Sequence, residues 1–182
     1  MEFTGLLILK ALWLYLPIGL ANMAPVFFRK AKFLAIPIDF KFVFSKEPLF
    51  GSHKTWRGLV TATLTGGLAF WLQQYLYQFS SFQKISLIEY PAFPVWTGFM
   101  VGLGVILGDL VKSFFKRRLR IQPGHHWIIF DQIDYIIGGL VFYSFFVSFS
   151  WQIVVIIFAF GFLLTVLTNH LGFYLKIKET KW

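Results

Sequence analysis

Charged residues gather in one stretch of this largely apolar chain, between Gly108 and Asp134. If the segment that starts at Asp109 is helical, five polar residues spaced at i, i+3, i+4, i+7 and i+8 share one face of that helix. These residues are Asp109, Lys112, Ser113, Lys116 and Arg117. Asp131 and Asp134 likewise share a face of the following helix. Because ionisable side chains are costly near a membrane core, such a set predicts a functional site.

The residue types in this stretch indicate the chemistry. Carboxylates suit Mg²⁺, which proteins hold through one or two carboxylates together with substrate phosphates. Lysine and arginine bind the phosphates themselves. We therefore predict a site for a polyphosphate and its metal, with Asp109, Asp131 and Asp134 as ligands. Two plainer interpretations stay open: lysines that extend toward the headgroups beside a neutralising aspartate, and Asp131 as the N-cap of its helix.

A second basic cluster has the sequence SHKTWRG, residues 52–58. Its Lys54, Thr55 and Arg57 suit the binding of phosphate oxygens, and Trp56 suits stacking or anchoring at a membrane interface. Basic residues that flank a membrane helix are also what membrane topology requires. The cluster therefore supports a phosphate site only together with the first one.

The composition indicates an integral membrane protein. Of 182 residues, 57% are hydrophobic and 14% are charged, against about 25% charged in a soluble domain. The chain has no cysteine, which excludes disulfides and thiolate metal sites. No internal repeat or long linker divides it. We therefore expect an all-α, polytopic membrane protein with a single domain over residues 1–182.

Five membrane-spanning helices are predicted from the apolar runs. About 20 apolar residues cross a hydrocarbon core of about 30 Å, and the first three runs cover Phe3 to Phe28, Gly58 to Phe79 and Val95 to Phe115. The run from Ile133 to Tyr174 would make about 60 Å of helix, twice that thickness. We divide it at Ser148, Ser150 and Gln152 into two spans joined by a tight turn. The weak points are this turn and the mid-helix pair Gln73 and Gln74.

The basic residues predict the orientation, because lysine and arginine are retained on the cytoplasmic side. Seven lie between Arg29 and Arg57, five between Lys112 and Arg120, and three after Tyr174. Five spans with the N-terminus outside and the C-terminus in the cytoplasm satisfy this distribution, and place the charged stretch at the cytoplasmic face of the cell membrane. The net charge of +9 is attributed to topology and to anionic headgroups, so nucleic acid is not an expected partner.

The connector between the first two spans has a pattern of its own. Ile38, Phe40, Phe42 and Phe44 alternate with mostly polar residues. A period of two is typical of a short strand or of an extended segment at the interface. The connector is thus expected to be a lid over the site or a membrane anchor.

The charged stretch resembles the signature of CDP-diacylglycerol synthases, and the similarity is closer to the archaeal branch, the CDP-archaeol synthases. The signature residues are Gly108, Asp109, Leu110, Ser113, Lys116, Arg117, Pro123, Gly124, His125, Asp131, Ile133 and Asp134. The archaeal features are five spans, the pair Asn22 and Pro25, PIDF at 37–40, KTWRG at 54–58 and DQID at 131–134. The similarity covers nearly the whole chain. His126 and Trp127 replace two glycines of the bacterial signature, so no role is carried over to His125.

The resemblance implies a lipid-phosphate cytidylyltransferase of phospholipid biosynthesis. A lipid phosphate, best matched by an unsaturated archaeol phosphate, would attack the α-phosphorus of CTP and release pyrophosphate. Because a phosphate monoester is already an anion near pH 7, the enzyme mainly positions two polyanions and screens their charge. Expected phosphate-binding residues are Lys54, Thr55, Arg57, Lys112, Ser113, Lys116 and Arg117; expected metal and catalytic residues are Asp109, Asp131 and Asp134; further candidates are Asn22, Asp39 and Gln132. Mg²⁺ is the expected cofactor.

Other functions stand as alternatives to this one. A phosphatidate cytidylyltransferase that uses diacyl lipid would have similar motifs. A small transporter would place polar groups near the bilayer midplane, whereas here they gather at one end. A non-enzymatic assembly protein would need no convergent acids and bases. The sequence does not predict an oligomeric state.

Overall fold

The computed structural model describes residues 2–44, 46–121, 125, 127, 129–174 and 176, with the side chains of residues 2–4 left aside. The predictions that involve Pro123, Gly124 and His126 fall outside these residues. So do those on Lys178 and Lys181 of the basic tail.

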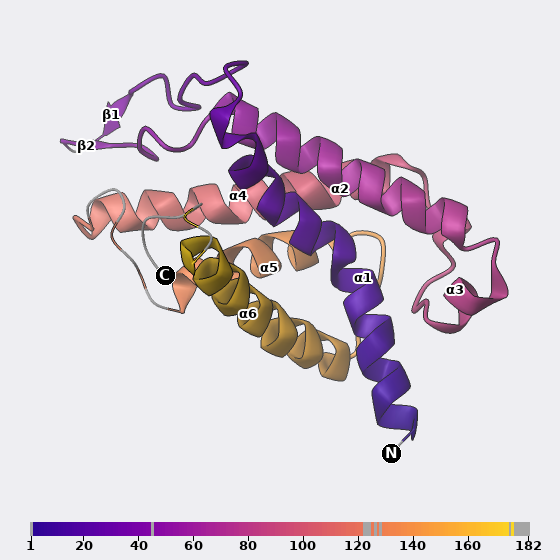
Figure 1. Ribbon diagram of the computed structural model, residues 1–182. Helices are drawn as coiled ribbons and strands as arrows, with labels where there is room; N and C mark the ends of the chain where they lie inside the picture. The colour runs from indigo at the N-terminus through magenta and orange to yellow at the C-terminus, as the bar shows by residue number, and fades with distance from the viewer. Residues whose placement is uncertain are drawn as a thin grey trace.

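Most of the described residues lie in five longer helices (Figure 1): α1 (Glu2–Phe27), α2 (Trp56–Leu76), α4 (Trp96–Arg118), α5 (Phe130–Tyr143) and α6 (Trp151–Tyr174). A short helix α3 (Ser80–Lys84) and two 3₁₀ turns, Phe28–Lys30 and Tyr90–Ala92, lie in the connectors. The prediction of a helical protein is confirmed in this coarser form. The one sheet among the described residues is a hairpin of β1 (Val43–Phe44) and β2 (Glu47–Pro48).

Among the described residues, three segments are long and apolar enough to cross a bilayer: Gly5–Lys30, Trp96–Arg118 and Trp151–Tyr174. The predicted fourth span is shorter as a helix than expected, since α5 has 14 residues and is therefore about 21 Å long. The predicted tight turn at Ser148 to Gln152 is wrong in its extent, because residues 144–150 all lie between α5 and α6. The phenylalanines and the valine in this stretch keep it apolar without helical structure.

Helix α4 is the centre of the bundle and packs against α1, α2 and α5 (Figure 1). Glycines allow the close approach on both sides. A Cβ on Gly102 would meet the Thr63 Cα of α2 at 2.9 Å, and a Cβ on Gly138 of α5 would meet the Gly108 Cα at 3.0 Å. Small residues of this kind let membrane helices pack backbone to backbone.

Polar side chains inside the bundle are used to join helices. Gln74 Nε2 donates to the carbonyls of Tyr90 and Phe93 at 3.1 and 2.6 Å, and buried Gln73 donates to the Trp13 carbonyl of α1. The glutamine pair, a weak point of the second predicted span, is therefore accommodated near the C-terminal end of α2, because each amide replaces water with a backbone partner.

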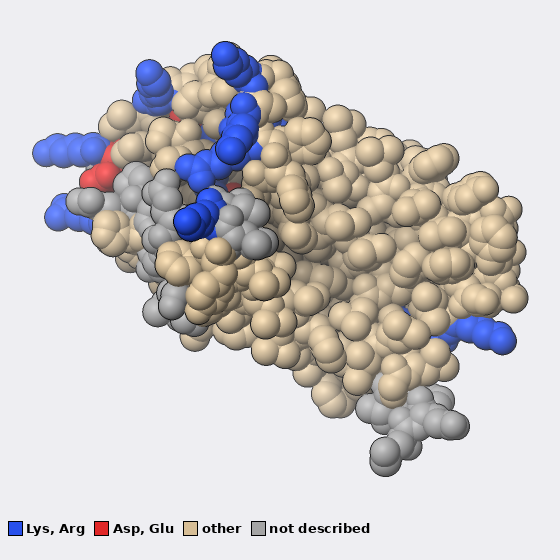
Figure 2. Space-filling model, viewed as in Figure 1, with Lys and Arg blue, Asp and Glu red and all other residues tan. Residues whose placement is uncertain are grey.

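The connector between α1 and α2 forms the β1–β2 hairpin, in which Val43 pairs with Pro48 and Phe44 with Glu47. This confirms a strand within the alternating segment. The hairpin projects from the same end of the bundle as the last turns of α4 (Figure 1). Basic side chains gather at this end of the visible surface, while most of the rest is uncharged (Figure 2).

Candidate active site

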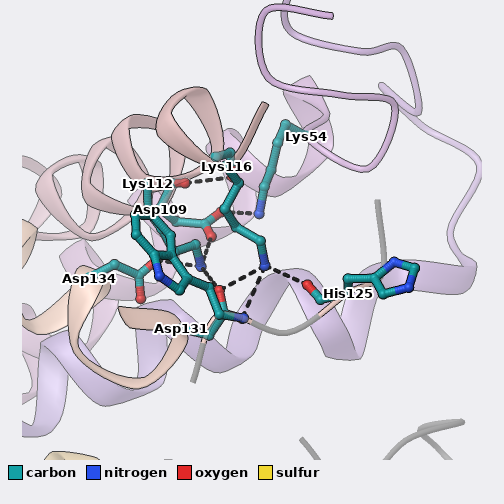
Figure 3. Close-up of polar contacts among 9 residues, drawn as sticks. Lys54, Asp109, Lys112, Lys116, His125, Asp131 and Asp134 are labelled. Carbon is teal, nitrogen blue, oxygen red and sulfur yellow. Dashed lines mark hydrogen bonds and ion pairs between the residues drawn. The ribbon is translucent and has the colours of Figure 1, made fainter. Parts of the chain in front are cut away.

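Three carboxylates converge on one ammonium group at the basic end of the bundle (Figure 3). Lys112 Nζ lies 3.1 Å from Asp109 Oδ1, 3.0 Å from Asp131 Oδ1 and 2.8 Å from Asp134 Oδ2. Asp134 is buried and Lys112 nearly so. We call these four residues the acid–lysine centre. The structure thus brings together the three aspartates that the sequence singled out.

The helix packing explains why the carboxylates meet. Asp109 and Lys112 lie one turn apart on α4, and Asp131 and Asp134 lie in the first turns of α5. At Gly108 a Cβ would collide with the carbonyl oxygen of Asp134. Since glycine has no Cβ, the two backbones touch there, and the acids of both helices reach the same ammonium.

Two further lysines pair with the outer side of the centre (Figure 3). Lys54, just before α2, lies 2.5 Å from Asp109 Oδ2. Lys116 lies 3.0 Å from Asp131 Oδ2 and donates to the carbonyl of His125 at 2.7 Å. Three carboxylates are therefore balanced by three ammonium groups. The paired charges offset the free-energy cost of removing the carboxylates from water. To bind an added polyanion, the lysines would have to turn away from the acids and toward it.

Asp131 is not the N-cap of α5, so that interpretation is wrong. Ile129 holds the cap position and makes no side-chain cap bond. Asp131 lies inside the first turn, where its Oδ2 accepts the Trp127 N–H at 2.7 Å. A carboxylate at this end of a helix is favoured by the helix dipole, and its remaining capacity is used by Lys112 and Lys116.

A cavity of about 230 Å³ opens beside the centre. Its walls come from the connector and from α4, with His125 from the loop between α4 and α5 and one acid from α5: Phe50, Gly51, His53, Lys54, Lys112, Ser113, Lys116, Arg117, His125 and Asp131. The Ser113 hydroxyl donates to the Asp109 carbonyl at 2.7 Å. The lining carries four lysine or arginine side chains and one acid, so the cavity suits a phosphate-rich ligand.

The structure places the other predicted residues outside the cavity. Thr55 caps α2 by accepting the Gly58 N–H at 3.3 Å, and Arg57 donates to the Ala31 carbonyl. Both hold the connector to the helix start. Gln132 is buried on α5 and its Oε1 has no hydrogen-bond partner among the described residues. Asn22 is half-buried near the end of α1.

Asp39 organises the connector. Its Oδ1 accepts the Lys41 N–H at 3.0 Å, and its Oδ2 accepts those of Phe50 and Gly51 at 3.0 and 3.2 Å. Burial alone would raise the pKa of this carboxyl, but the backbone donors outweigh it and hold the pKa below its usual value. Asp39 therefore acts on the site by fixing the two residues that begin the cavity wall.

Sequence reasoning missed part of this wall. Phe50 and Gly51 carry no polar side chain, and His53 is not among the phosphate-binding residues predicted from the sequence, yet all three line the cavity. The alternating connector pattern was the available signal, since it indicated a lid. Nothing in the residue spacing indicated which connector residues would face α4.

The acid–lysine centre has suitable ligands for a divalent cation, but a lysine side chain lies among them. Three carboxylates directed at one point are ligands of the type that Mg²⁺ prefers, but the ammonium of Lys112 is the cation at that point. Within the described ranges no three His, Cys, Asp or Glu side chains are spaced as a ready-made metal cluster. The residues therefore fit the metal on condition that Lys112 moves away from them.

The chain is similar to known proteins over almost all of its length. The model of the family "CarS-like: CDP-archaeol synthase" matches residues 4–182. The chain belongs to this family. A CDP-archaeol synthase of Methanocaldococcus jannaschii is 30% identical over 177 residues, which cover 97% of this chain and 98% of that protein. A CDP-archaeol synthase of Pyrococcus furiosus is 38% identical over 136 residues, 74% of each chain.

A solved structure of the same kind supports the fold. It is described as an intramembrane enzyme for archaeal membrane lipids biosynthesis, and it aligns with a TM-score of 0.71 and 27% identity over 89% of this chain and 94% of that chain. The resemblance noted in the sequence is therefore confirmed. Family membership also decides for an enzyme over the transporter and assembly-protein alternatives.

Proposed function

We propose that this protein is a CDP-archaeol synthase, which transfers the cytidylyl group of CTP to the phosphate of an archaeol-type lipid and releases pyrophosphate. The observation that carries the proposal is the acid–lysine centre, which opens into a basic cavity at one end of an apolar helical bundle. The names of the relatives supply the lipid class. The geometry supports a reaction between two phosphates at the membrane surface.

In the proposed reaction, an oxygen of the lipid phosphate forms a bond to the α-phosphorus of CTP. The bond from that phosphorus to the oxygen bridging to the β-phosphate breaks, and the electron pair leaves with pyrophosphate. The nucleophile needs no general base because it is already ionised. Catalysis therefore rests on positioning and on charge compensation, the tasks for which a cavity lined by lysine and arginine is suited.

The basic residues of the cavity have distinct places in this scheme. Lys54 stands at the start of α2, while Lys116 and Arg117 stand on α4, on the facing wall. Phosphates between the two walls would draw Lys54 from Asp109 and Lys116 from Asp131, since each ammonium is already within reach of the cavity. We assign these three residues to the triphosphate and the lipid phosphate.

The carboxylates are assigned to Mg²⁺. Asp109, Asp131 and Asp134 would hold the ion once Lys112 turns toward the phosphates. When bound, Mg²⁺ neutralises charge on the reacting phosphates. Until then Lys112 offsets the repulsion among the acids, because it compensates all three at once.

We further propose five membrane helices, with the N-terminus outside and the site at the cytoplasmic face. Support comes from three candidate spans and from the concentration of basic residues at the end that carries the site. The helix α2 and the short α5 both pack against the candidate span α4. The stretch 144–150, in which three phenylalanines and a valine stand among three serines, would complete the crossing that α5 begins.

Purified protein incubated with labelled CTP, Mg²⁺ and a lipid phosphate tests the function. We expect CDP-lipid and pyrophosphate with an unsaturated diether glycerol phosphate, and far less product with a diacyl one. Chelation of Mg²⁺ should abolish product. Product from diacyl lipid alone would overturn the lipid assignment, and no turnover of CTP with either lipid in folded protein would overturn the activity.

A further inference from the structure

The β1–β2 hairpin needs support from outside itself. Each strand has two residues, and apart from the ladder one backbone bond, Leu49 N–H to the Phe42 carbonyl at 3.0 Å, extends the pairing. Isolated two-stranded hairpins are marginal in water even when longer. Its side chains at Val43 and Phe44 are exposed, so burial of those residues does not supply the support.

Arg118, the last residue of α4, supplies it. Its guanidinium donates to the Phe44 carbonyl of β1 and to two carbonyls of β2, Pro48 at 2.8 Å and Glu47 at 3.3 Å. One side chain thus joins both strands. The planar fork of arginine is suited to this, since it presents several donors in fixed directions.

Two aromatic rings hold the same guanidinium. The Arg118 Cζ lies 5.2 Å from the centroid of Phe44 on the hairpin and 5.0 Å from that of Phe114 on α4. Such cation–π contacts stabilise a cation at these distances. The hydrogen bonds and the rings both join the hairpin to α4, and Arg118 itself is not among the residues that line the cavity.

The contact lies close to the cavity in the chain, because the hairpin leads directly into one of the cavity walls. Phe50 and Gly51, just after β2, line that wall, while Ser113, Lys116 and Arg117 of α4 line another. The ion pair of Lys54 with Asp109 ties the later part of the connector to α4, and Arg118 ties the hairpin before Phe50 to the same helix. Asp39 fixes Phe50 and Gly51 within the connector, but it makes no bond to α4 among the described contacts, so it cannot replace that link.

We propose that Arg118 is a positioning residue that clamps the hairpin to α4 and so keeps the wall at Phe50 and Gly51 in place for the nucleotide. In this role Arg118 contacts no substrate, and it belongs neither to the basic residues that line the cavity nor to the SHKTWRG cluster. The clamp itself stands on the contacts above, while its effect on CTP rests on the proposed function. Loss of the clamp should therefore weaken CTP binding more than it slows the reaction of bound CTP.

The test compares Arg118→Ala, Arg118→Lys and Arg120→Ala with the wild type. Arg120 is exposed, lies two residues further on and makes no side-chain contact among those described, so its variant removes the same charge without the clamp. The readouts are amide hydrogen exchange of the peptide over residues 42–51, KM for CTP, kcat and thermal stability in detergent.

For Arg118→Ala we expect exchange in the hairpin to rise at least about tenfold, KM for CTP to rise about tenfold, and kcat at saturating CTP to stay within about threefold, with unchanged thermal stability. Lysine should resemble alanine, because it keeps the charge and loses the fork. Arg120→Ala should match the wild type. Unchanged hairpin exchange would overturn the clamp, whatever the activity. Raised exchange with an unchanged KM would overturn its role toward CTP, and an inactive wild type would instead refute the proposed function.

Discussion

Lys112 Nζ lies 2.8 Å from Asp134 Oδ2 and joins α4 to α5 through the most buried of the three carboxylates. The same ammonium also contacts Asp109 and Asp131 at 3.1 and 3.0 Å. A lysine therefore occupies the point that three carboxylates offer to a cation. The ammonium offsets the repulsion among the three carboxylates, and its position makes Lys112 a competitor of any divalent ion.

The competition predicts that Lys112→Met binds a divalent cation better than the wild type when CTP is absent. Without the ammonium, three carboxylates repel one another and attract a cation in its place. We expect the affinity for Mn²⁺, measured by electron paramagnetic resonance, to rise at least about tenfold. Lys116 contacts Asp131 but not the other two acids, so Lys116→Met should show a smaller rise in Mn²⁺ affinity. Equal affinities in wild type and Lys112→Met would contradict the account.

The hydrogen bonds of Asp39 predict that the stability of the folded connector depends on pH. Its carboxylate accepts three backbone donors and its pKa is held below the usual value. The stabilisation is therefore complete above the unfolded pKa of about 3.9 and is lost as the pH falls toward the lower folded value. Trp56, whose ring lies 6.2 Å from that of Phe40, reports on the connector by fluorescence. Asp39→Asn should remove the acid transition that we expect in the wild type, and an identical transition in both would argue against this role.

Gly138→Ala is predicted to separate α4 from α5. The added Cβ would meet backbone atoms of Gly104 and Gly108, which cannot rotate away. Overpacking of this kind costs about 1–3 kcal/mol. The midpoint of thermal unfolding in detergent should fall, and CDP-lipid formation should fall with it because Asp134 lies one turn away on α5. Gly5→Ala, where nothing lies within 4 Å, is the control; equal stability of the two variants would contradict the packing argument.

Most of the site can be predicted from the sequence, because the spacing of its charged residues determines which side chains share a helix face. Asp109 and Lys112 are one helical turn apart, and so are Asp131 and Asp134, so each helix alone determines which of its side chains point the same way. That the two faces would meet depends on Gly108 and Gly138, whose role appears only when the helices are packed. The convergence was therefore inferred from charge, and the close backbone contact was not foreseen.

The rest of the site lies in the connector, where sequence patterns are weaker. Thr55 and Arg57 were expected at phosphates, but a helix start also needs a cap and a firm connection, and these tasks take both side chains. Arg118 stands among several basic residues that topology alone would explain. Its function depends on carbonyls 70 or more positions away in the chain, which no local pattern reveals.

Two buried tyrosines offer a matched test of the bundle core. Tyr135 bonds Tyr15 of α1 at 2.7 Å and Thr165 of α6 at 2.8 Å, whereas the Tyr143 hydroxyl has no partner among the described residues. Interhelical hydrogen bonds in membranes contribute about 0.6 kcal/mol each, at most about 1.7. Tyr135→Phe should therefore lower thermal stability in detergent by about 1 kcal/mol, and Tyr143→Phe should not. A larger loss of thermal stability for Tyr143→Phe than for Tyr135→Phe would contradict the stabilising role of the hydrogen bonds that Tyr135 makes.

The initial rate of CDP-lipid formation by Asp134→Asn at saturating CTP and Mg²⁺ tests the central claim, that the acid–lysine centre catalyses cytidylyl transfer. Asparagine keeps the shape and removes a charged ligand, so we expect the rate to fall at least about a hundredfold, or about 2.7 kcal/mol in the barrier. Asp131→Asn should behave alike. Glu89→Gln, an exposed change in the connector after α3, should retain the wild-type rate. A folded Asp134→Asn protein with a rate within about threefold of wild type would contradict the account.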